Sequence, residues 1–218
     1  MRLVANDQIQ KLEEVATEFS KRLGEFGPVV IAGGAVRDSL VGRPPKDYDL
    51  FVLEQDEELD YVSERMQPYL TDLQPHDFMP GHQSEPFLIR SVWWEGVIVQ
   101  ILASPQPDLR CLVNTFDWNI TLFGYEGGVF QNFGGVQPHV GAPLRLHKVT
   151  YPRSTLRRGF RYSERFQMVL EPETIDTLCR AVAAQADAPR CEDCNWKCVT
   201  NKYGDWVCQN PVCFLHQQ

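Results

Sequence analysis

The stretch over residues 29–53, VVIAGGAVRDSLVGRPPKDYDLFVL, constrains the fold more than any other part of the chain. Its first residues are β-branched, which suits a buried strand, and two glycines then allow a tight turn. Residues 35–40 continue as a helical turn, and residues 48–53 alternate as a second strand. We therefore expect a strand, glycine turn, helix and strand in succession. The free backbone N–H groups at the start of that helix favour an anion, usually phosphate.

Two acidic residues lie at the start of the second expected strand. Asp47 and Asp49 are two positions apart, so the period of a strand places both carboxylates on the same face. Adjacent carboxylates repel each other and need a cation, and oxygen ligands suit Mg²⁺. A phosphate-binding turn beside a divalent-metal pair indicates phosphoryl or nucleotidyl transfer.

This stretch resembles the signature of the polymerase-β-like nucleotidyltransferases, and it is most similar to the head domain of class II tRNA CCA-adding enzymes and bacterial poly(A) polymerases. Their pattern is Gly-Gly-x-Val-Arg-Asp, then Leu-x-Gly, then Asp-x-Asp. Each element alone is common, but all of them in order are unlikely to arise by chance. In this chain the pattern falls on Gly33, Gly34, Val36, Arg37, Asp38, Leu40, Gly42, Asp47 and Asp49.

The resemblance implies an α+β fold, in which helices flank a mixed nucleotidyltransferase sheet. It implies that Asp47 and Asp49 are catalytic and hold two Mg²⁺ ions. It also implies that an NTP, either ATP or CTP, is bound by Gly33, Gly34, Arg37 and Asp38.

The family's third metal-binding carboxylate usually lies on a later strand, and here the sequence departs from the pattern. Residues 87–92 and 97–102 are typical of a β-hairpin, and its second strand carries Gln100 in place of an acid. Glu95 lies in the expected turn. The third ligand is therefore either supplied from elsewhere or missing.

Residues 115–125 resemble the family's second motif, Arg-Arg-Asp-Phe-Thr-Ile-Asn-Ala. Asp117 matches the aspartate, but Thr115 and Phe116 stand where the family has two arginines. We predict that Asp117 is catalytic and points into the cleft from a strand. It would serve either as the third metal ligand or in ribose and nucleotide recognition, and a capping aspartate at a strand end is the structural alternative.

The segment over residues 151–178 resembles the start of the neck of CCA-adding enzymes, with two helices. Arg157, Arg161 and Arg165 recur at every fourth position and share one helical face, and we predict that Arg157 and Arg161 bind the nucleotide. Residues 145–165 hold six arginines and one lysine against one glutamate, which suits a nucleic-acid or triphosphate contact. A solvated amphipathic helix is the alternative. We find no Glu-Asp-x-x-Arg, the family's base-selecting motif.

Five of the seven cysteines lie between residues 191 and 213. This clustering indicates metal chemistry in a reducing cytoplasm, with disulfides as the minor alternative. The spacing predicts a small hairpin that carries one structural Zn²⁺ bound by Cys191, Cys194, Cys208 and Cys213. Cys198 and His216 are further candidate ligands, so the ligand set is not unique.

We expect three parts: a nucleotidyltransferase head over residues 1–150, a short basic helical neck over 151–188 and a zinc-binding ribbon over 189–218. The net charge of −8 argues against a uniformly basic nucleic-acid surface but permits a local basic patch. No apolar run reaches the length of a membrane span and the start has no apolar signal-peptide core, so we expect a cytoplasmic protein without a membrane partner.

The leading interpretation is a metal-dependent nucleotidyltransferase that moves NMP from an NTP to an acceptor hydroxyl and releases pyrophosphate. The resemblance makes an RNA 3′ end, as in tRNA, the expected acceptor. The missing arginines before Asp117 and the absence of the family's body and tail keep a second class open, in which a toxin-like enzyme modifies a protein or small molecule. Gln100 favours a third class, a non-catalytic module that binds nucleotide or RNA. The sequence leaves the oligomeric state open.

Overall fold

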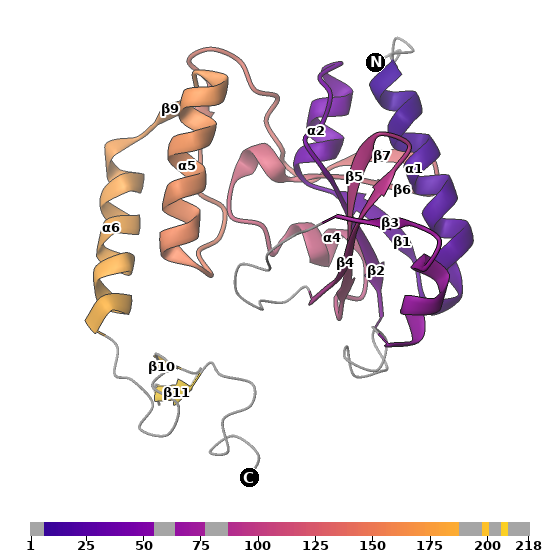
Figure 1. Ribbon diagram of the computed structural model, residues 1–218. Coiled ribbons are helices and arrows are strands. Elements are labelled where there is room, and N and C mark those ends of the chain that lie inside the picture. The colour runs from indigo at the N-terminus through magenta and orange to yellow at the C-terminus, as the bar shows by residue number, and fades with distance from the viewer. Residues whose placement is uncertain (1–6, 55–63, 77–86, 188–197, 201–205, 209–218) are drawn as a thin grey trace.

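The computed structural model describes residues 7–54, 64–76, 87–187, 198–200 and 206–208 (Figure 1). Within these residues the main sheet has seven strands in the order β3-β4-β5-β2-β1-β6-β7. Strands β2 and β5 pair in parallel, and all other neighbours in this sheet are antiparallel. The predicted mixed sheet is therefore confirmed. The strands are β1 (Val29–Ala32), β2 (Tyr48–Leu53), β3 (Gln74–Pro75), β4 (Phe87–Trp94), β5 (Val97–Ser104), β6 (Phe123–Glu126) and β7 (Val129–Asn132).

Both faces of the central strands are covered. Because side chains alternate along a strand, Ile31 and Leu50 pack on the face covered by α1 (Asp7–Leu23), while Val30 and Phe51 pack on the other face. That second face is covered by α4 (Leu109–Val113). Helix α1 faces the sheet with one apolar stripe at three- and four-residue spacing, formed by Ile9, Leu12, Val15, Phe19 and Leu23.

The predicted strand, turn, helix and strand unit is present as β1, α2 (Gly34–Leu40) and β2. Two hairpins frame it in the sheet. The β4–β5 hairpin turns at Glu95 and Gly96, and the β6–β7 hairpin turns at Gly127 and Gly128, all with positive φ. Two successive residues of this conformation match the right-handed twist of the strands that they join. Short 3₁₀ turns lie at η1 (Gly24–Phe26), η2 (Gln67–Leu70) and η3 (Asn119–Thr121).

The predicted neck contains α5 (Pro152–Phe166) and α6 (Pro172–Asp187), which lie side by side (Figure 1). Between the two helices, β9 (Val169–Leu170) pairs in parallel with β8 (Pro143–Leu144). This part shares a third apolar cluster with the head, which includes Trp118, Leu144, Phe166 and Leu178. The neck is thus packed against the sheet domain by buried side chains.

Near the C-terminus, β10 (Cys198–Thr200) and β11 (Trp206–Cys208) form the predicted antiparallel hairpin, with Cys198 opposite Cys208. Cys191, Cys194, Cys213 and His216 lie outside the described residues, so the zinc site stays a prediction. The boundaries of the three expected parts also stay predictions. In the part of the chain that the structure describes, no helix has the length and apolar character that a membrane span requires.

Candidate active site

The glycine turn after β1 is tied to its neighbours by backbone hydrogen bonds. Gly33 has φ +83°, a conformation that a side chain would strain, and its N–H donates to the Phe123 carbonyl at 2.8 Å. Its own carbonyl accepts from the Arg37 N–H at 3.3 Å. A Cβ on Gly34 would lie 3.4 Å from Nη2 of Arg37, so the guanidinium lies directly against the turn. The sequence pattern thus places Gly33, Gly34 and Arg37 together.

Asp47 directly precedes β2 and Asp49 is its second residue, and both are half-buried. Burial and, to a smaller extent, the neighbouring Asp47 carboxylate raise the pKa of Asp49 to about 7, while Arg158 and Lys46 oppose the shift. The two carboxylates are therefore close enough to repel each other, as the sequence predicted. Lys46 offers partial compensation, with its Nζ 3.8 Å from Oδ2 of Asp47.

Gln100 fills the position beside this pair. It is the register partner of Asp49 across the parallel β2–β5 ladder, and its Nε2 donates to Oδ2 of Asp47 at 3.2 Å. Glu95 is engaged elsewhere, because its Oε2 lies 2.8 Å from Nζ of Lys11. The donor set is thus two carboxylates with an amide beside them, and such hard oxygen ligands fit Mg²⁺. Asp47 and Asp49 are the residues that could hold the ion.

Asp117 was predicted on a strand, and this is wrong. It lies in a bend before η3, because the chain there turns through a Thr121 N–H to Trp118 carbonyl bond of 2.9 Å. The alternative of a capping aspartate at a strand end is not met either, because β5 ends at Ser104 and β6 begins at Phe123. Asp117 is buried, and its Oδ2 lies 2.6 Å from Nη2 of Arg158 on α5.

The buried carboxyl of Asp117 faces the neck and its cation. Burial raises the pKa of Asp117, and Arg158 opposes that shift. Among the residues that the structure describes, no group of three or more His, Cys, Asp or Glu side chains could share a metal ion. In this geometry Asp117 does not complete a three-carboxylate set with Asp47 and Asp49. Its nucleotide-recognition role remains a prediction.

Helix α5 presents Arg158, Tyr162 and Arg165 to the head, at spacings of four and three residues. Burial raises the pKa of the Tyr162 hydroxyl, and so do the Asp117 and Asp49 carboxylates nearby. Arg158 and Tyr162 therefore join the two acidic groups of the head in one cluster. The sequence pattern did not identify them, because the phase of the helix is fixed by Thr155, Gly159 and Phe166, whose burial only the structure shows.

The predicted nucleotide ligands Arg157 and Arg161 are exposed on α5. Neither forms an ion pair within the described residues, and their nucleotide contact stays a prediction. Asp38 is placed differently from expectation, because it is buried and both of its oxygens are occupied. Its Oδ1 accepts from Nε of Arg37 at 2.7 Å and its Oδ2 from Nη2 of Arg165 at 3.1 Å. This placement favours a positioning role for Asp38.

No protein-family model matches the sequence, and a search of curated proteins finds no significant match. Solved structures are similar in fold. The Thermotoga maritima CCA-adding enzyme complexed with tRNA is 21% identical, with a TM-score of 0.55 over 84% of this chain and 44% of that one. A CCA-adding enzyme with CTP is 19% identical, with a TM-score of 0.55 over 83% and 43% of the two chains.

A tRNA-processing enzyme in an apo form is 18% identical, with a TM-score of 0.54, and covers 87% of this chain and 51% of its own. This chain therefore spans about half or less of the length of these enzymes. At such identities the likeness shows the fold. The chain has a fold similar to that of CCA-adding enzymes, as the resemblance in sequence implied.

Proposed function

We propose that this chain is a metal-dependent nucleotidyltransferase, which transfers NMP from an NTP to an acceptor hydroxyl and releases pyrophosphate. The observation that carries the proposal is the pair Asp47 and Asp49 at the start of β2 in this fold, with Gln100 beside it on β5. The fold likeness to CCA-adding enzymes, which have been solved with CTP and with ATP, supports an NTP as the substrate.

We assign a role to each residue of the site from its position. Asp47 and Asp49 would hold Mg²⁺, which when bound supplies charge neutralisation for the triphosphate and activation of the attacking hydroxyl. Gly33 and Gly34 let the backbone approach the phosphates closely, and Arg37 adds a fixed charge against the same turn. Asp38 holds the Arg37 guanidinium in place, and Arg158 and Tyr162 close the site from the neck.

An RNA 3′ end is the acceptor that we propose. Its support is the fold likeness to an enzyme solved with tRNA, together with the exposed arginines Arg153, Arg157 and Arg161 on α5. Exposed guanidinium groups along one helix suit a phosphate backbone. We further propose that a structural Zn²⁺ orders the C-terminal ribbon. Cys198 and Cys208 lie opposite each other in the β10–β11 hairpin, and at least one of them would be a ligand of the ion.

A second candidate function is a binding module that holds nucleotide or RNA without transfer. Gln100 favours it, because the amide beside Asp49 donates to Asp47 where a third carboxylate would bind metal. One assay distinguishes nucleotidyl transfer from binding without transfer.

The protein is incubated with each labelled NTP, Mg²⁺ and total cellular RNA, and the labelled product is identified. We expect label at RNA 3′ ends, and we expect Asp47→Ala and Asp49→Ala each to reduce it by at least ~100-fold, because each change removes a metal ligand. Glu95→Ala removes an acid that pairs with Lys11 outside the site, so it is the matched control and should keep full activity.

Turnover of Asp47→Ala within a few fold of wild type would contradict the metal-pair assignment. NTP binding without label in any RNA, protein or small molecule would favour the binding module.

A further inference from the structure

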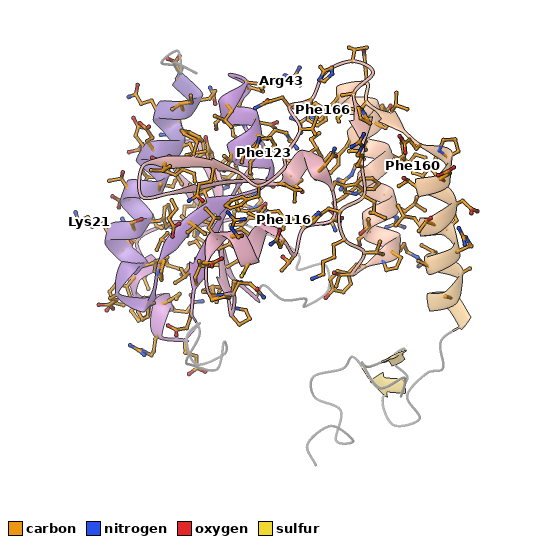
Figure 2. All side chains as sticks on the ribbon, turned by 180° about the vertical axis from the view of Figure 1, so that it is seen from behind. Lys21, Arg43, Phe116, Phe123, Phe160 and Phe166 are labelled. Atoms are coloured by element: carbon orange, nitrogen blue, oxygen red, sulfur yellow. The ribbon has the colours of Figure 1, made fainter. Side chains whose placement is uncertain are left out.

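Phe166, the last residue of α5, is surrounded by three arginines from different parts of the fold. The guanidinium carbons of Arg37, Arg165 and Arg43 lie 4.7, 4.8 and 5.6 Å from the centre of its buried ring. Each cation is attracted by the ring, but the ring carries no net charge. Figure 2 shows Arg43 and Phe166 near each other between α2 and α5. The packing therefore concentrates positive charge without neutralising it.

The carboxylate partners of this cluster fall short of its cations. Asp38 pairs with both Arg37 and Arg165, while Arg43 has no carboxylate partner in the part of the chain that the structure describes. Three cations thus share one anion among these residues. Nη1 of Arg37 is in addition buried and makes no hydrogen bond to a described residue.

A pocket of about 230 Å³ opens beside the ring. Two arginines, Arg43 and Arg165, line this pocket together with the aromatic ring of Phe166 and with His139. Nδ1 of His139 lies 3.1 Å from the Gln137 carbonyl and must donate to it, so Nε2 can donate to a phosphate oxygen when the ring is in its imidazolium form. Neither Asp47 nor Asp49 lines this pocket.

We propose that Arg43, Arg165 and His139 form a phosphate-binding pocket that is separate from the Asp47/Asp49 metal site. A phosphate group is the ligand that two guanidinium groups recognise best, because each can donate two parallel hydrogen bonds to its oxygens. The phosphate comes either from the backbone of a polynucleotide or from a free nucleotide or pyrophosphate. The polynucleotide source rests on the proposed function, since it would be the acceptor strand; phosphate binding itself does not.

The test measures binding by the full chain in EDTA, where metal-dependent transfer cannot occur. One probe is a fluorescent single-stranded oligoribonucleotide, followed by anisotropy at several salt concentrations, and the other is sodium pyrophosphate, followed by calorimetry. We expect Arg43→Gln to weaken at least one probe by ~10-fold. If the oligonucleotide is the ligand, the slope of log K against log salt should also shrink by about 0.7, the value for one lost phosphate contact.

Arg165→Gln should act in the same direction, and Arg43→Lys, which keeps the charge, should lose less than Arg43→Gln. Arg180→Gln is the matched control, because Arg180 is an exposed arginine on α6 that is already paired with Asp176. Arg165→Gln also removes an ion pair to Asp38 and could unfold the protein for that reason. Arg43→Gln breaks no ion pair within the described residues, so it tests the proposal even if Arg165→Gln unfolds.

Weakening in the oligonucleotide arm assigns the pocket to a strand, and weakening in the pyrophosphate arm assigns it to free phosphates. Wild-type affinity and salt slope in both Arg43→Gln arms would overturn the proposal, as would a wild-type chain that binds neither probe at low salt. The test measures binding alone, so its outcome does not depend on whether the chain has transferase activity. Failure of this proposal can therefore be distinguished from failure of the proposed function.

Discussion

The carboxyl group of Asp49 lies in surroundings that favour its neutral form, since burial and the Asp47 charge raise its pKa from 3.8 to about 7. Between these two values the folded chain keeps a proton that the unfolded chain has lost. The stability of the metal-free protein therefore falls as the pH rises through this window, and the loss is complete above pH 7. Such a cost at a site without its ligand is expected where a cation normally binds.

Asp49→Asn removes the charge and should remove this pH dependence. In EDTA, we expect the Tm of the variant minus that of wild type to increase from about pH 4 to pH 7 and to stay level above. Adding Mg²⁺ at pH 8 should then raise the Tm of wild type more than that of the variant. A Tm difference that does not change with pH would show that Asp49 is not perturbed in the folded protein.

Asp117→Asn tests how the buried Asp117–Arg158 pair acts. The 2.6 Å contact fixes Arg158 beside the site, and Asp117 shares no three-carboxylate group with the metal pair among the described residues. We therefore expect a higher KM for NTP and a weaker preference for NTP over dNTP, with kcat reduced by less than ~10-fold. A fall in kcat as severe as that of Asp49→Ala would instead make Asp117 a metal ligand. Asp176→Asn, at an exposed acid of α6, is the control.

At the scale of elements, one contact fixes how the neck helix lies on the head. Trp118 is fully buried, and its Nε1 donates to the Thr155 carbonyl on α5 at 3.1 Å. A Cβ on Gly159 would lie 2.5 Å from the indole ring. The absence of a side chain at Gly159 is what allows α5 to approach Trp118 and to bring Arg158 to Asp117.

Gly159→Ala should therefore destabilise the protein by about 1–3 kcal/mol, because the indole is enclosed and cannot move aside. The same substitution at an open helix position would stabilise by about 1 kcal/mol, so the sign of the effect decides the interpretation. Unfolding is followed by denaturant titration, and NTP affinity is measured in parallel. Ser154→Ala, at an exposed position of α5, is the control. A stabilised Gly159→Ala variant would contradict the close contact.

The elements that the sequence predicted best are those whose pattern is local. The strand over Tyr48–Leu53 has the expected bounds, the glycine turn follows from a residue that tolerates positive φ, and the predicted hairpin turns at Glu95 and Gly96 as expected. The order of strands in the sheet rests on pairings between distant segments, which no local pattern contains. The bend at Asp117 was missed for the same reason, since its backbone is held by the distant His147 N–H at 2.7 Å.

Part of the candidate site could likewise not be predicted from the sequence. The signature correctly placed Arg37 against the glycine turn and Asp47 close to Asp49, because each of these contacts joins residues only a few positions apart. The repeat of Arg157, Arg161 and Arg165 identified a basic face of α5, but not which face meets the head. That phase is set by Gly159 against Trp118, one residue from Arg158, and a shift of one residue turns a helix by about 100°.

At the scale of the whole molecule, charge is distributed unevenly. The chain carries a net charge of −8, yet the contact between head and neck gathers Arg37, Arg43, Arg158 and Arg165. A local group of cations in an acidic chain steers an anionic ligand to that region and disfavours binding of polyanions elsewhere. This arrangement agrees with the proposal that phosphate groups are bound where the head and the neck meet.

The C-terminal ribbon needs a source of stability other than a core, because residues 189–218 contain few aliphatic side chains. We predict one tightly bound Zn²⁺ per chain, held by four of Cys191, Cys194, Cys198, Cys208 and Cys213. Strong chelation should then unfold the ribbon while the sheet domain keeps its apolar core and its NTP binding. Elemental analysis and amide hydrogen exchange, with and without chelator, measure the two effects separately.

The zinc prediction also separates two roles for the ribbon. If it helps to seat the acceptor, the chelated protein and a chain ending at residue 189 should both lose affinity for the oligoribonucleotide, while pyrophosphate binding stays unchanged. Unchanged oligoribonucleotide affinity of both proteins would show that the ribbon has only a structural role. A preparation without zinc, in which the same cysteines are paired as disulfides, would refute the metal site altogether. Cys198 and Cys208, which are opposed in the β10–β11 hairpin, are the first pair to map in that case.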